Sequence, residues 1–203
     1  MVTKEQRQVL MEEARRELAR RTMGDFVLYV DDNYRMNWHH RLLCDYLDKL
    51  ACKEIRRLMV FMPPRHGKSE LVSRKFPAYL LGRNPDTSII SCSYSADLAS
   101  RMNRDVQRLI DSEKYSLLFP ESHLFGKNIR STAKGSFLRN SDIFEIVNHR
   151  GTYRSSGVGG GITGMGGEYI IIDDPVKNRE DADSATMREK VYDWYTSTLY
   201  TRL

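Results

Sequence analysis

The chain has 203 residues, of which 40% are hydrophobic, and it carries a formal net charge of +5. This length and composition supply one sizeable core, so we expect one domain, with or without a small appendage. The charge favours anionic partners but is far below that of a chromatin protein.

Two further features bear on the compartment. Three cysteines, Cys44, Cys52 and Cys92, lack C-x-x-C spacing, which predicts buried thiols in a reducing compartment. The N-terminal segment is charged throughout and has no apolar stretch long enough for a signal peptide or a membrane span. We therefore expect a soluble intracellular protein without a membrane partner.

The first half of the chain alternates helix and strand patterns. Helical spacing covers 3–22 with a thin apolar stripe and 38–51 with a stronger one. The run "RLMVFM", 57–62, is continuously apolar, as is typical of a strand buried on both faces of a parallel sheet. A helix over 68–81, a strand over 88–93 and a helix over 95–111 follow. This order predicts a doubly wound α/β fold.

The second half of the chain has shorter predicted elements and a glycine-rich stretch. Residues 135–156 predict two or three short antiparallel strands appended to or inserted in the sheet. The glycine-rich stretch 157–167 is either a flexible linker or a functional mobile loop. It runs directly into the apolar strand of "EYIIIDDP", 168–175, which favours the loop. Residues 179–203 are predicted to be helical.

The segment "MPPRHGKS", 62–69, is similar to a phosphate-binding loop. Gly67, Lys68 and Ser69 match the end of the pattern G-x-x-x-x-G-K-[ST], but Met62 replaces its first glycine. The two prolines remove backbone donors, so a phosphate would depend on the amides of residues 65–69. Lys68 would bridge the phosphates, and the Ser69 hydroxyl would bind magnesium.

A pair of carboxylates strengthens this interpretation. Asp173 and Asp174 directly follow an apolar run, at the carboxyl end of a predicted strand. ATP hydrolysis requires one carboxylate that holds magnesium and another that positions the attacking water. The alternative is a solvated strand end whose acidic residues cap the next helix. Together with the upstream Gly-Lys-Ser, the pair favours a nucleotide site.

These motifs carry a resemblance. "MPPRHGKSE", "SCSYSADLASRMNRDVQRLI" and "GVGGGITGMGGEYIIIDDPVKNRED" occur in an order that resembles the ATPase domain of the large subunit of tailed-bacteriophage terminases. The resemblance runs from about Trp38 to the C-terminal end. It implies an α/β fold of the P-loop NTPase class, ASCE or RecA-like, with a mainly parallel central sheet flanked by helices and a short antiparallel β appendage. We expect an N-terminal helical extension over 1–37 and the ATPase domain over 38–203.

The resemblance also implies an activity, cofactors and partners. The activity is hydrolysis of ATP, with Mg²⁺, to drive double-stranded DNA into a procapsid in the host cell cytoplasm. Asp173 and Ser69 would hold the metal, partly through water, and Asp174, Arg65 and Lys68 would be catalytic. The implied partners are DNA, bound independently of sequence, a portal protein, the small terminase subunit and further copies of the chain in a ring. The candidate nucleotide-binding residues are Trp38, His40, Pro64, Arg65, His66, Gly67, Lys68, Ser69 and Glu70.

Two departures from the family pattern qualify this expectation. The catalytic carboxylate of the family is usually Glu, and Asp174 is one methylene shorter. Large subunits also normally continue through a coupling motif and a nuclease domain, whereas this chain ends at Leu203. We therefore expect an N-terminal fragment or truncated product, incomplete at its C-terminal end and without nuclease activity.

Several roles stay open at this point. Trp38 and the neighbouring histidines either contact the base, as the resemblance implies, or form an aromatic staple at a helix start. Arg65 is the best candidate for stabilising the transferring phosphate, while Arg101, Arg104 and Arg108 are either rivals or solvated charges. A basic stretch either contacts DNA phosphates or is scattered surface charge. Its members are Lys127, Arg130, Lys134, Arg139, Arg150 and Arg154, interleaved with Phe137 and Tyr153.

The leading functional prediction is an ATP-driven packaging motor. One alternative is a helicase-like DNA translocase, which predicts further nucleic-acid motifs beyond residue 203. A second alternative is a nucleotide-binding or assembly module that does not turn over ATP.

Overall fold

The computed structural model describes residues 3–124, 131–132, 135–162, 164 and 166–202. Its centre is a four-stranded mixed sheet in the order β4-β5-β1-β6. The strands are β1 (Ser88–Ser93), β4 (Ile143–Glu145), β5 (Thr152–Gly157) and β6 (Tyr169–Asp173). β5, β1 and β6 are parallel, and β4 pairs antiparallel with β5. The prediction of an α/β fold with a mainly parallel sheet is confirmed, whereas the P-loop NTPase class stays a prediction.

Both faces of the central strand β1 are covered, which explains why its residues from Ile89 to Ser93 are all buried. Ile89 of β1 faces a large core that also contains Phe26 and Tyr79, while Ile90 faces a second, smaller core with Trp194. The large core lies beneath α2 (Met23–Val30), α3 (Trp38–Ala51), α4 (Phe76–Arg83), α5 (Ala96–Ile110) and α6 (Glu113–Leu118). The small core lies beneath α8 (Ala185–Trp194) and η2 (Tyr195–Leu199).

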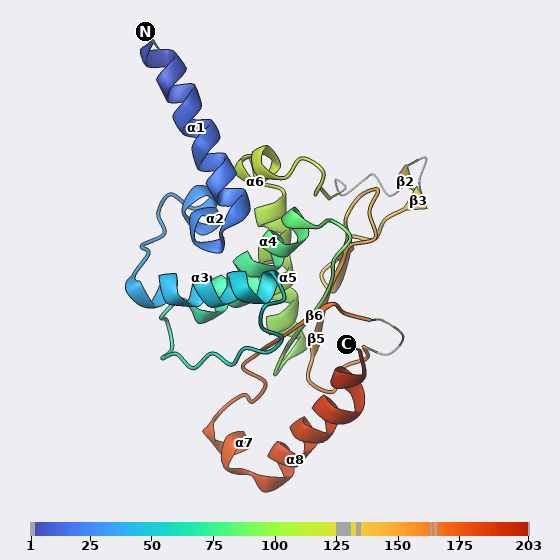
Figure 1. The fold of residues 1–203 in the computed structure, drawn as a ribbon. Helices are drawn as coiled ribbons and strands as arrows, with labels where there is room; N and C mark the ends of the chain where they lie inside the picture. Colours follow the sequence, from blue (N-terminus) through green and yellow to red (C-terminus); the bar gives the residue numbers. More distant parts are fainter. Residues whose placement is uncertain (1–2, 125–130, 133–134, 163, 165, 203) are drawn as a thin grey trace.

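The remaining elements lie at the periphery. In Figure 1, α1 (Lys4–Arg21) projects from the body at one end, and α7 (Arg179–Asp183) and α8 lie at the opposite end. β2 (Ser131–Thr132) and β3 (Gly135–Ser136) form a separate antiparallel ladder, and η3 (Tyr200–Arg202) ends the described chain. Helix α2, which the sequence did not predict, is largely buried, with Met23, Phe26, Val27 and Tyr29 in the core.

The predicted strand over 57–62 is wrong. No described residue forms a β-ladder with this segment. Its side chains alternate, so that Leu58, Val60 and Met62 pack against the large core while Met59 and Phe61 are 78% and 84% exposed. Residues that flank the segment on either side contact β6, since Tyr169 donates a hydrogen bond to the carbonyl of Ala51 (3.2 Å) and Lys68 pairs with Asp173.

The predicted helix over 68–81 is present but is not uniform. A π-helical turn, η1 (Glu70–Lys75), precedes α4. Pro77 lacks an N–H and cannot donate to the carbonyl one α-turn earlier, which favours this wider turn. The prediction of three buried thiols also fails at one position, because Cys44 and Cys92 are buried and Cys52 is exposed. Cys52 follows the last residue of α3, where the chain turns toward solvent.

Candidate functional site

The tertiary structure brings together the two acidic residues and the lysine that the sequence singled out. The Lys68 ammonium lies 3.4 Å from a carboxylate oxygen of Asp173 and donates a hydrogen bond to Asp174, which is 106 residues further along the chain. Burial acts to lower the pKa of Lys68, but the hydrogen bond to Asp174 and the charges of both carboxylates raise it. The lysine therefore stays cationic at the carboxyl end of β6.

The two carboxylates have different surroundings. Asp173 is 4% exposed and accepts a hydrogen bond of 2.9 Å from the Ser73 hydroxyl. Asp174 has a side chain that is 58% exposed and a backbone φ of 46°, in the left-handed region that non-glycine residues rarely adopt. Its carbonyl accepts a hydrogen bond of 3.2 Å from the N–H of Tyr94, which anchors this conformation. One carboxylate is thus fixed and the other is open to solvent.

The backbone of the loop is suited to bind an anion. Arg65 and Gly67 have φ values of 64° and 87°, and His66 between them is not left-handed. Alternation of this kind turns successive N–H groups toward one side. Within the described residues, the N–H groups of Arg65, His66 and Gly67 have no hydrogen-bond acceptor. Three donors are therefore available beside the start of a helix.

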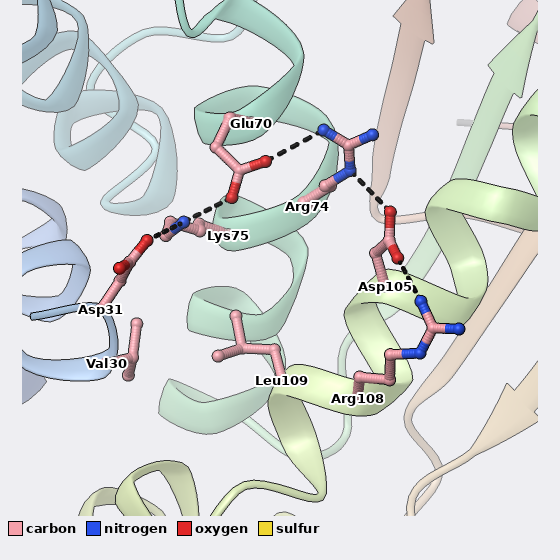
Figure 2. A pocket seen from close by; sticks show the side chains of 8 residues that line it. All are labelled: Val30, Asp31, Glu70, Arg74, Lys75, Asp105, Arg108 and Leu109. Atoms are coloured by element: carbon pink, nitrogen blue, oxygen red, sulfur yellow. Dashed lines mark hydrogen bonds and ion pairs between the residues drawn. The ribbon is translucent and has the colours of Figure 1, made fainter. Parts of the chain in front are cut away.

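Glu70 lines a charged cavity of about 390 Å³, together with Arg74 and Lys75 (Figure 2). Its carboxylate accepts hydrogen bonds from Lys75 (2.5 Å) and Arg74 (2.9 Å), and Lys75 also pairs with Asp31 (3.2 Å). Burial acts to raise the pKa of Glu70, but the hydrogen bond and charge of Lys75, together with Arg74, lower it. The cations and carboxylates that line this cavity neutralise one another.

The aromatic and histidine residues upstream of the loop lie close to it. His40, on the first turn of α3, has its Nε2 atom 3.0 Å from the carbonyl oxygen of His66. Trp38 is 73% exposed and packs edge-on against His39 with ring centroids 5.5 Å apart. Sequence reasoning missed Tyr34, whose hydroxyl lies against Gly67, because an isolated aromatic residue in a turn carries no local signal.

The candidate arginines are mostly exposed. Arg65 extends from the loop into solvent, as do Arg101 and Arg104 from α5. Arg108 pairs with Asp105 at 2.8 Å, at the rim of the charged cavity. Arg65 is therefore the candidate that the loop itself carries beside Lys68.

Both ends of the glycine-rich segment are hydrogen-bonded to neighbouring elements, while the choice between a flexible linker and a functional mobile loop stays a prediction. The N–H of Val158 donates to the carbonyl of Ser93 (2.8 Å), and the N–H of Gly167 donates to that of Arg202 (2.8 Å). Arg154 donates to the carbonyl of Gly161 at 2.8 Å. A side chain at Gly157 would meet the backbone nitrogen of Ala96 at 2.8 Å, so this close approach requires glycine.

The proposed DNA surface is partly contradicted. Tyr153 is fully buried and stacks on Phe144 with ring centroids 5.1 Å apart, so it belongs to the core. Arg139 pairs with Asp111, and Arg154 is engaged with the glycine-rich segment as described, whereas the Arg150 side chain is 89% exposed. Phe137 is partly buried. Lys127, Arg130 and Lys134 lie outside the described residues.

The fold and site define a class of protein: an α/β protein in which a lysine-bearing loop faces two carboxylates at the edge of a mixed sheet. The family model described as "Terminase large subunit, T4likevirus-type, N-terminal" matches residues 59–202, and the chain belongs to this family. Membership gives the chain a role in phage DNA packaging, involving DNA and the packaging machinery. No curated protein matches the chain. Among the described residues, no helix has the length and apolarity needed to cross a membrane.

Proposed function

We propose that this chain is the ATP-hydrolysing motor domain of a terminase large subunit, which powers translocation of double-stranded DNA into a procapsid. The observation that carries the proposal is the meeting of Lys68 with Asp173 and Asp174, beside a loop in which the amides of residues 65–67 have no acceptor among the described residues. Family membership supports the packaging role. Its implied partners are the portal protein, the small subunit and further copies in a ring, in the cytoplasm of the host cell.

The residues present fit a nucleotide and its magnesium ion. The amides of residues 65–69 and the Lys68 ammonium supply donors and positive charge for phosphates. The Ser69 hydroxyl and the Asp173 carboxylate are hard oxygen ligands of the kind that Mg²⁺ prefers, with water completing its shell. Bound Mg²⁺ would neutralise charge that develops on the transferring phosphate.

The remaining side chains have distinct proposed tasks. Asp174 would orient the attacking water and take its proton, since its carboxylate is open to solvent. Arg65 would stabilise charge on the transferring phosphate. Lys68 would exchange its bond to Asp174 for a bond to a phosphate oxygen, which leaves the carboxylate free for water.

The test measures ATP binding by calorimetry and phosphate release in the presence of Mg²⁺. Lys68→Ala is expected to weaken ATP binding by about 10- to 100-fold, the value of one charge-assisted hydrogen bond, and to abolish turnover. Lys177→Ala, at an exposed lysine just after the carboxylates, is the matched control and should behave as the native chain. ATP binding without turnover in the native chain would support the assembly module instead, and absence of binding would refute both.

A further inference from the structure

His40 connects the start of α3 to the phosphate loop. We infer that His40 is a positioning residue that sets the orientation of the peptide between His66 and Gly67, so that the Gly67 N–H is presented to a phosphate. This inference rests on the proposed nucleotide site. It gives His40 a task different from contact with the base.

The tautomer of His40 follows from its two hydrogen bonds. Its Nδ1 atom accepts a hydrogen bond of 3.1 Å from the backbone N–H of Asn37, the N-cap of α3. A nitrogen that accepts cannot carry a proton, so in the neutral ring the proton lies on Nε2. That Nε2–H donates to the carbonyl of His66, 3.0 Å away. The helix cap therefore fixes the ring as a donor toward the loop.

The geometry of the peptide group transmits this contact to the amide. The peptide bonds of the chain include no cis bond among the described residues, and in a trans peptide the C=O and the following N–H point in opposite directions. With the His66 carbonyl held toward His40, the Gly67 N–H is fixed on the side of the loop away from His40. There it has no acceptor among the described residues.

His40 and Tyr34 also leave little space for a side chain at Gly67. A Cβ at this position would lie 2.8 Å from the His40 Nε2 atom and 3.1 Å from the Tyr34 hydroxyl, and φ is 87°. The left-handed backbone disfavours a residue with a Cβ, and a Cβ here would also displace the His40 ring. The Tyr34 and His40 rings pack with centroids 5.3 Å apart, so the tyrosine keeps the imidazole against the loop.

A second histidine acts on the neighbouring carbonyl. The Nδ1 atom of His66 lies 2.8 Å from the carbonyl oxygen of Pro64, which can only accept, so Nδ1 donates. The carbonyls of Pro64 and His66 are thus both engaged by imidazoles. Carbonyl oxygens repel phosphate, and holding two of them in place leaves the loop amides as the groups available to an anion.

The experiment compares His40→Gln with His40→Met, two side chains of similar length of which only glutamine carries an N–H donor. Binding of ATP and of inorganic triphosphate is measured by calorimetry on the full chain, and folding by melting temperature. His40→Met is expected to weaken both ligands by about 3- to 10-fold, the value of one hydrogen bond, and His40→Gln to recover most of that loss. His40→Phe is a second donor-free variant, and His123→Phe at an exposed histidine is the control.

The two ligands and two substitutions separate the outcomes. Equal weakening of ATP and inorganic triphosphate by His40→Met supports action through the phosphate loop, whereas weakening of ATP alone shows a base contact and overturns the inference. The inference is also overturned if folded His40→Met or His40→Phe binds both ligands as tightly as the native chain. It is overturned as well if His40→Gln binds them as weakly as His40→Met. If the native chain binds neither ligand, the proposed function itself fails.

Discussion

Asp174 combines an unfavourable backbone conformation with an ion pair that competes with nucleotide binding. Its φ of 46° is unfavourable for a residue with a Cβ, and its carboxylate forms an ion pair with the Lys68 ammonium. The same ammonium cannot fully serve a phosphate while it is bonded to this carboxylate. The pair therefore competes with nucleotide binding, while the proposed hydrolysis needs the carboxylate.

Replacing Asp174 by Asn is expected to separate these two effects. ATP binding should become tighter by up to about 5-fold, since an exposed ion pair contributes up to about 1 kcal/mol. Hydrolysis should fall by about 10²- to 10⁴-fold through loss of the base. Calorimetry and phosphate release provide the measurement, with Asp193→Asn at an exposed position of α8 as control. Native turnover in Asp174→Asn would remove this residue from the mechanism.

At the scale of elements, η1 determines which side chains of the loop helix face the cavity in Figure 2. Its wide turn places Glu70, Arg74 and Lys75 together, with Lys75 only 4% exposed and its Nζ atom 5.0 Å from the Tyr34 ring centroid. Asp31 at the end of α2 completes the ion pairs. The network ties the helix after the phosphate loop to the N-terminal helices.

Glu70→Gln is expected to reduce the free energy of unfolding by about 1–2 kcal/mol at pH 7, because the buried Lys75 loses one of its two carboxylate partners. Solvent screens the partly exposed Glu70 carboxylate, which keeps this loss small. The pKa of Glu70 is lowered in the folded state. Its contribution is therefore complete above the unfolded value of about 4.3 and is lost as the pH falls through the lowered pKa. Urea denaturation of both proteins should show a difference that shrinks below about pH 4. Glu189→Gln on α8 is the control, and a difference independent of pH would contradict the network.

At the scale of the whole molecule, the N-terminal segment is continuous with the core. Phe26 of α2 is fully buried, with its ring centroid 5.3 Å from that of Tyr79 and 6.4 Å from that of Tyr115. The start of α1, in contrast, exposes Leu10 at 57%. The boundary between an N-terminal extension, 1–37, and the ATPase domain, 38–203, stays a prediction. The packing of Phe26 makes it testable.

Phe26→Ala is expected to lower the free energy of unfolding of the whole chain by about 3–5 kcal/mol, the value of removing a buried aromatic ring. Denaturation followed by circular dichroism should show one transition shifted to lower urea. Leu10→Ala should change stability by no more than about 0.5 kcal/mol. If residues 1–37 were an independent extension, Phe26→Ala would leave the main transition in place.

The sequence by itself determined the elements whose signals are local. Periodicity predicted α1, α3 and α5, and the alternation with β1 predicted the α/β class. The match to Gly-Lys-Ser singled out Lys68, and the position directly after an apolar run singled out Asp173 and Asp174. The family of the chain was also predicted from these motifs and is confirmed.

Only the tertiary structure decided which segments pair and which side chains meet. An apolar run has the same local pattern whether or not it finds a strand partner, so 57–62 was predicted as a strand although Met59 and Phe61 face solvent. Tyr153 was placed on a surface because burial depends on Phe144 across the ladder. The hydrogen bond between His40 and the loop joins residues 26 positions apart. No local sequence pattern in either segment predicts a hydrogen bond of this kind.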